Sequence, residues 1–168
     1  ACGPHINNPF VPRARSEMAW QALQLARKHA GAAAPVEREL IEALGHRYAD
    51  PPPSNRATLD AAYARAMRRG WKNHPGASDV GALFAEALMD LRPWDLWTRD
   101  LKPQPGTEEV LETLKAVLAL DANHPLANHL LIHTVEAGPN PEMADEAANR
   151  LRDLQPAMGH NVHMPSHI

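Results

Sequence analysis

Near its C-terminal end the sequence repeats at an interval of 34 residues. The repeat is carried by one leucine and two histidines: Leu120 recurs as Leu154, His129 as His163 and His133 as His167. A period of this length is typical of chains built from two-helix units, which bury their apolar faces by stacking on one another. The interval therefore predicts a helical-repeat fold, and it puts two pairs of histidines in equivalent places.

Helical signals extend through the rest of the chain, whereas strand signals are nearly absent. Apolar residues recur at three-to-four spacing, for example at Val110, Leu114 and Val117, as on the buried face of an amphipathic helix. Proline and glycine separate such segments, and the short turns indicate antiparallel helical pairs. The pattern predicts eight helices, near 13–31, 36–49, 55–70, 76–91, 107–120, 125–137, 141–154 and from 159 to the end.

Two short segments carry a matching pattern at the start of a helical pair. One reads Leu44-Gly45-His46-Arg47-Tyr48, and its conservative copy reads Val80-Gly81-Ala82-Leu83-Phe84. Small and apolar residues recur at the expected spacing in the second helices, at Leu59, Tyr63, Ala66, Ala144, Ala148, Leu151 and Pro156. Together with the 34-residue period, these segments resemble the tetratricopeptide repeat (TPR) family.

Two phrases are similar to those of a subgroup of largely uncharacterised bacterial TPR proteins: Ala137-Gly138-Pro139-Asn140-Pro141-Glu142 and Gly159-His160-Asn161-Val162-His163-Met164-Pro165-Ser166-His167-Ile168. The resemblance covers nearly the whole chain and implies an all-α fold of antiparallel helical pairs stacked as a TPR-like solenoid. Residues 1–168 then form a single domain with a long inserted loop at 92–106, the alternative being an irregular helical bundle. Because the sequence begins without Met and stops inside a predicted helix, we expect a fragment whose flanking repeats are missing.

The composition excludes several kinds of partner. A formal net charge of -3 provides no broad basic face, so we expect no nucleic acid. No apolar run approaches the ~18 residues of a membrane span. The sequence also lacks a glycine-rich phosphate loop, a Cys-x-x-Cys pair and a Gly-x-Ser-x-Gly elbow. It leaves localisation open between cytoplasm and periplasm.

The resemblance implies that His129 and His133 face a concave groove, because the first helix of each pair lines the groove in this family. His163 and His167 occupy the same places one repeat later, and His46 takes the place of His133 in an earlier repeat. Residues four apart share one face of a helix, so each His-x-x-x-His pair can bind one metal ion. Packed helices lie ~8–10 Å apart, so the two pairs could converge on one ion or hold two.

Two further residues could contribute to such a site. Glu136 follows His133 by three residues and could ligate the metal, act as a general base or orient a histidine. His160 precedes His163 by three residues and could complete the coordination shell. His5 lies in a loop that could reach the mouth of the groove. Imidazoles with at most one carboxylate suit Zn, Cu, Ni or Fe rather than Mg or Ca, and the reaction, if the chain is an enzyme, stays open.

The same residues also fit other roles. The histidines could contact a peptide or protein in the groove without any metal, the usual role of this family, or could form hydrogen bonds between helices. Trp94 and Trp97 in the 92–106 loop should pack on adjacent helices or form a lid over the groove. Pro165 separates the last two histidines, so the segment from residue 159 is either a bent first turn that aims His167 or a loop.

Overall fold

The computed structural model describes residues 4–6 and 10–168, and the regular secondary structure within these ranges is helical. The elements, with η for a 3-10 helix, are α1 (Arg13–His29), η1 (Ala30–Ala32), α2 (Pro35–Leu44), α3 (Ala57–Asn73), α4 (Ser78–Met89), α5 (Thr107–Leu120), α6 (Pro125–Val135), η2 (Pro141–Ala144), α7 (Asp145–Leu154), α8 (Gly159–His163) and η3 (Met164–His167). The all-helical class predicted from the sequence is therefore confirmed.

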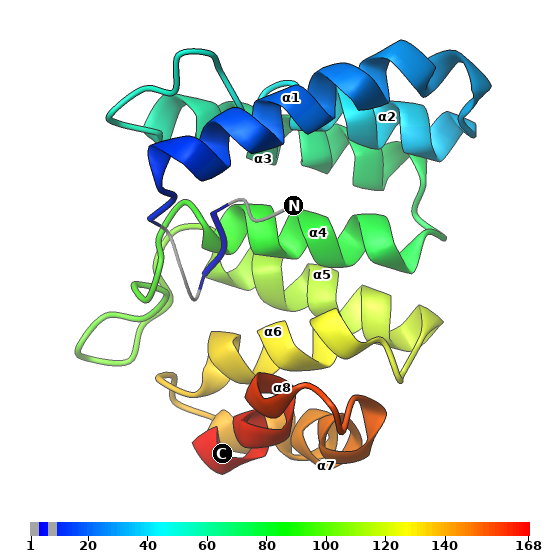
Figure 1. The fold of residues 1–168 in the computed structure, drawn as a ribbon. Coiled ribbons are helices and arrows are strands. Elements are labelled where there is room, and N and C mark those ends of the chain that lie inside the picture. Colours follow the sequence, from blue (N-terminus) through cyan, green and yellow to red (C-terminus); the bar gives the residue numbers. More distant parts are fainter. Residues whose placement is uncertain (1–3, 7–9) are drawn as a thin grey trace.

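Successive helices pack on one another in chain order. From α2 to α7 each helix contacts the next, and α4 also contacts α6. Figure 1 shows this order as layers that run from α1 at the top to α7 and α8 at the bottom. The core between them is apolar, with side chains at most 2% exposed at Met67, Phe84, Leu114, Leu130 and Leu151. The packed helix pairs expected from the short turns are thus present.

The helix that carries the first histidine pair, α6, begins with a clear local signal. Pro125 occupies its first turn, where the missing N–H costs no hydrogen bond. His124 caps the helix, because the N–H of Ala127 donates to its Nδ1 at 3.2 Å. Nε2 of the same ring lies 3.1 Å from Oδ1 of Asp79 on α4. His124 therefore both starts α6 and ties it to α4.

The second helix ends earlier than expected, at Leu44 rather than near residue 49. The N–H of Gly45 closes the last turn of α2, and the chain then turns. Arg47 is drawn inward, where it forms an ion pair with Asp90 at 2.8 Å, with both side chains 7% exposed. His46 is left exposed in the turn instead of lying on a helical face.

The connection between α4 and α5 packs on the end of α6. Nε1 of Trp97 donates to the carbonyl oxygen of Thr134 at 2.6 Å. The Trp97 ring lies so close to Gly138 that an added Cβ there would be 2.7 Å from it. The N–H of Thr98 donates to the carbonyl of Lys102 and closes the tip of the loop. Trp97 thus packs on the adjacent helix, the first of the two roles expected for the tryptophans.

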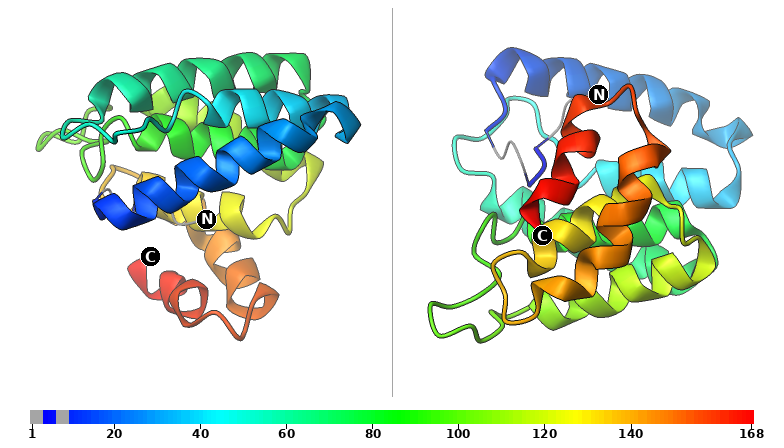
Figure 2. Two further views of the ribbon diagram at one scale, coloured as in Figure 1. Left: turned by 45° about the horizontal axis from the view of Figure 1, so that its top comes forward. Right: turned by 90° about the horizontal axis from the view of Figure 1, so that it is seen from below.

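The C-terminal segment is divided between His163 and Met164 into α8 and η3. Pro165 lies in the first turn of η3, where a residue without an N–H is tolerated. Met164 is fully buried, so its side chain anchors the segment in the core. Figure 2 shows α8 and η3 beside α7, and η3 contacts both α6 and α7. Two conformations were predicted for this segment, a bent helical turn and a loop. The structure has the helical turn.

Candidate metal centre

The first predicted pair, His129 and His133, lies on one face of α6. The ring centroids are 4.8 Å apart, as expected for residues one turn apart. The two residues are only 7% and 5% exposed, and the rings of Trp94 and His160 pack against them. The structure therefore brings this pair together, but in the interior of the protein rather than on an open groove surface.

A third histidine, His160, reaches the pair from α8. Its ring centroid lies 4.9 Å from that of His129 and 6.1 Å from that of His133. One ligand atom from each of the three rings lies within 4.8 Å of the others. Nitrogen ligands on one ion, with bonds of ~2.0–2.1 Å, are about 3.4 Å apart, so a group with this spacing could hold a common ion. We call these three histidines the inner cluster.

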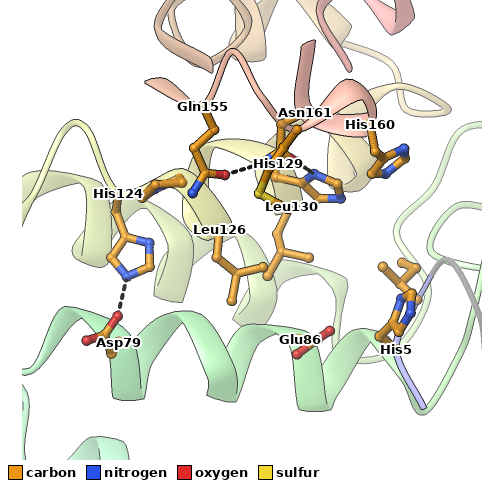
Figure 3. A pocket seen from close by; sticks show the side chains of 13 residues that line it. His5, Asp79, Glu86, His124, Leu126, His129, Leu130, Gln155, His160 and Asn161 are labelled. Carbon is orange, nitrogen blue, oxygen red and sulfur yellow. Dashed lines mark hydrogen bonds and ion pairs between the residues drawn. The ribbon is translucent and has the colours of Figure 1, made fainter. Parts of the chain in front are cut away.

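Hydrogen bonds fix the orientation of His129. Its Nδ1 lies 2.9 Å from Oδ1 of Asn161, and Nδ2 of Asn161 donates to Oε1 of Gln155. These two bonds are drawn in Figure 3. Since an amide oxygen only accepts, Nδ1 of His129 is the donor and carries the ring proton. Nε2 of His129 therefore has the lone pair that a metal ion requires.

The ring of His133 is held in the same tautomer. Its Nδ1 lies 3.0 Å from Oε1 of Glu136, and its side chain is 1% exposed. Trp94 covers the ring in an edge-to-face contact, with centroids 5.2 Å apart. Nε2 of His133 is buried and has no hydrogen-bond partner among the described residues. A buried nitrogen lone pair without a hydrogen-bond partner is costly, and a bound ligand would remove that cost.

Glu136 contacts two histidines at once. While Oε1 accepts from His133, Oε2 lies 2.5 Å from Nδ1 of His167. Burial alone would raise the pKa of Glu136, but the hydrogen bonds with His133 and His167 outweigh burial and lower the pKa. The carboxylate is therefore ionised at neutral pH and accepts from both rings. Ligand atoms of His133, Glu136 and His167 also lie within 4.8 Å of one another, so this group too could hold a metal ion.

The surroundings of His129 and His160 favour the neutral form of each ring. Burial, and then the neighbouring His133, lower the pKa of His129 to about 4, although the hydrogen bond with Asn161 opposes them. Burial and His133 also lower the pKa of His160. Neutral imidazole is the form that binds metal ions, so at neutral pH neither ring has to lose a proton first.

The second predicted pair, His163 and His167, lies further out on α8 and η3. Their ring centroids are 5.0 Å apart, and both residues are exposed. The 34-residue register makes His163 the counterpart of His129, yet His160 is the residue that joins the inner cluster. The structure thus keeps each predicted pair together, and the two pairs meet where His133 and His167 share a candidate metal group with Glu136.

His46 lies apart from all these groups. It is exposed and lines a shallow hollow with Arg27 and Arg38, next to the end of α2. The groups of described residues that could hold a metal ion do not include it. The register that made it equivalent to His133 depended on a helix extending to residue 49, and α2 ends before that.

A cavity of about 440 Å³ opens beside the inner cluster, between α4, α6 and α8. His129 and His160 lie on one side of it, and His5 and Glu86 lie across from them (Figure 3). Burial raises the pKa of Glu86, and Leu126 and Leu130 form an apolar wall. His5 therefore reaches this cavity, as its loop position suggested.

Sequence reasoning did not single out Asn161 or Gln155, which orient His129. Asn161 and Met164 are three residues apart and both buried, so their spacing marks the buried side of α8. It does not reveal which helix they face. Comparisons with protein-family models, curated proteins and solved structures each find no match to this chain. Among the described residues, no helix combines the length and apolar character needed to cross a membrane.

Proposed function

We propose that the chain binds a transition-metal ion at the inner cluster of His129, His133 and His160. The observation that carries the proposal is Nε2 of His133, which is buried without a hydrogen-bond partner while Nδ1 of the same ring contacts Glu136. The nearby rings of His129 and His160 supply the further ligands. A ring held by a carboxylate at one nitrogen and bound to a metal at the other is a common arrangement in metal sites.

The donor set narrows the class of metal. Three imidazoles suit Zn, Cu, Ni or Fe. Three protein ligands leave a coordination position for water or a small molecule. The adjoining cavity is lined by His129 and His160, so it can supply this further ligand. The site is thus suited to an ion that takes a further ligand from the cavity.

Glu136 serves this site best as an orienting residue. Its two carboxylate oxygens each face an imidazole Nδ1, from His133 and from His167. Because both oxygens are engaged with imidazoles, we assign Glu136 an orienting role in preference to that of a general base.

For the scaffold, we propose that the helical pairs are TPR-type repeats. The support is the packing of successive helices and the 34-residue interval between His129 and His163. In a crystal structure, the α4/α5 and α6/α7 units should share one packing geometry. Pairs that do not superpose would contradict the repeat assignment.

A second candidate function is peptide binding without a metal. A cavity of about 660 Å³, lined by α1, α2 and α4, favours it, because apolar residues such as Leu23 and Leu40 surround Arg47 and Glu86. NMR titration of metal-free protein with short acidic and short basic peptides tests this function. Saturable shifts at residues of this cavity support it, and their absence from both titrations contradicts it.

Metal stoichiometry tests the primary proposal. Untagged protein is stripped with a chelator, titrated with Zn²⁺ at neutral pH and analysed for bound zinc. We expect the number of tightly bound ions to fall by one in the His129→Ala/His160→Ala variant. His46→Ala is the matched control, since this histidine lies outside the site, and it should bind zinc as the unmodified chain does. Equal zinc in the double variant and the unmodified chain would overturn the proposal.

A further inference from the structure

The outer histidine pair has an unusual contact between two ring nitrogens. Nε2 of His167 lies 3.2 Å from Nε2 of His163. The two residues are exposed at the end of the chain, on successive turns of α8 and η3. Two ring nitrogens this close need either a shared hydrogen bond or a metal ion between them. The position of the proton on each ring decides which of the two it is.

The proton of His167 is assigned by Glu136. Nδ1 of His167 lies 2.5 Å from Oε2 of Glu136, and an ionised carboxylate can only accept. Nδ1 is therefore the protonated nitrogen of the neutral ring. Nε2 of His167 carries a lone pair, and this lone pair is the one that faces His163.

The proton of His163 is assigned by Ser166. The Ser166 hydroxyl donates to the backbone carbonyl of His163 at 2.8 Å. Its oxygen also lies 3.3 Å from Nδ1 of His163. With the single hydroxyl proton used in this way, the tautomer of His163 that satisfies both contacts has its proton on Nδ1. Nε2 of His163 then carries a lone pair as well.

Two nitrogen lone pairs thus face each other at 3.2 Å. Such a contact is repulsive unless a cation lies between the two atoms. The separation is close to the about 3.4 Å expected for two imidazole ligands on one ion with bonds of ~2.0–2.1 Å.

We propose that His163 and His167 form a second, outer transition-metal site, with water molecules as the remaining ligands. Glu136 links the two sites as a shared positioning residue, because Oε1 holds His133 of the inner cluster and Oε2 holds His167. The outer site goes beyond the proposed function and does not require an ion at the inner cluster. A protein that binds two ions in this way has its metal sites coupled through one carboxylate.

Zinc stoichiometry of four matched proteins tests the outer site. The unmodified chain should bind two Zn²⁺ ions and His163→Ala should bind one, with the inner ion retained. His129→Ala/His160→Ala should also bind one ion, now the outer one. His29→Ala is the control, because His29 is an exposed histidine at the end of α1, and it should bind two.

The remaining outcomes are also decisive. One ion in both the unmodified chain and His163→Ala overturns the outer site and leaves the inner site standing. Two ions in both also overturn it, because the second ion then lies elsewhere. His163→Gln, which keeps a polar side chain, serves as a second variant should His163→Ala lose helical content by circular dichroism. If a proton bridges the pair instead, NMR resonances of His163 and His167 will not respond to Zn²⁺, which overturns the outer site.

Discussion

Nδ1 of His133 lies 3.0 Å from Oε1 of Glu136, and this contact leaves Nε2 as the nitrogen of the ring that can bind an ion. Nε2 is buried without a partner among the described residues. The carboxylate therefore decides which nitrogen of His133 is available to an ion. This relationship makes the role of Glu136 testable separately from that of the ligands.

Replacing Glu136 with glutamine should weaken Zn²⁺ binding by ~10–100-fold, the usual effect of removing a carboxylate that orients a ligating histidine. Glutamine has the same shape, but its amide does not hold the Nδ1 proton of His133 as a carboxylate does. Competition with a chromogenic zinc chelator measures the change. Glu142→Gln is the control, because Glu142 is an exposed residue of η2. A Zn²⁺ affinity in Glu136→Gln equal to that of the control would contradict this role.

Asn161 should act on the ion only through His129. Asn161→Ala removes the oxygen that accepts from Nδ1 of His129, and we expect ~10–100-fold weaker Zn²⁺ binding. Asn161→Asp retains an accepting oxygen at this position and should restore much of the affinity. If both variants bind Zn²⁺ equally, the hydrogen bond to His129 does not position the ring.

The metal-free protein should lose stability in acid because of His129. Burial lowers the pKa of this ring to about 4 in the folded chain, whereas an unfolded histidine titrates near ~6.5. The unfolded state therefore binds the proton first as the pH falls. The contribution of His129 is complete above about pH 6.5 and is lost as the pH falls through about 4, a change on the order of 3 kcal/mol.

Urea unfolding of the metal-free protein across this pH range measures the effect. His129→Leu removes the titrating ring, so its free energy of unfolding should vary less with pH than that of the unmodified chain. Parallel pH profiles for the two proteins would show that His129 is not kept neutral by the fold.

Trp94 should protect the inner cluster from solvent. Its ring meets His133 edge to face at 5.2 Å, although Trp94 itself is 58% exposed and has a positive φ of 63°. Trp94→Ala should lower the free energy of unfolding by ~0.5–1.5 kcal/mol, the usual range for an aromatic contact. It should also speed zinc release to a chelator in stopped-flow measurements. Leu101→Ala, in the same loop and also at positive φ, is the control, and equal release rates would argue against a covering role.

The helices were predictable because their signals are local. Proline and glycine mark their ends, and apolar residues such as Val110 and Leu114 recur at helical spacing. The meeting of His129 and His133 follows from the same spacing. His46 shows the limit, since Gly45 ends α2 early and places this histidine in an exposed turn.

The three members of the inner cluster were named from the sequence, but the sequence could not predict that His160, rather than His163, would meet His129 and His133. The 34-residue register treats His163 as the counterpart of His129, whereas His160 reaches the cluster. Which face of α8 meets α6 depends on the turn after α7, on buried Met164 and on the hydrogen bond between Asn161 and His129. These are contacts between distant parts of the chain, and helical periodicity carries no information about them.

An anomalous difference map from crystals of the zinc-loaded protein, recorded at the zinc absorption edge, tests the central claim most directly. We predict a peak ~2.0–2.1 Å from Nε2 of His133, within bonding distance of His129 and His160. The contact between Nδ1 of His133 and Glu136 should remain. No peak at the inner cluster in zinc-loaded crystals, or a peak bound through Nδ1 of His133 in place of Nε2, would contradict the account.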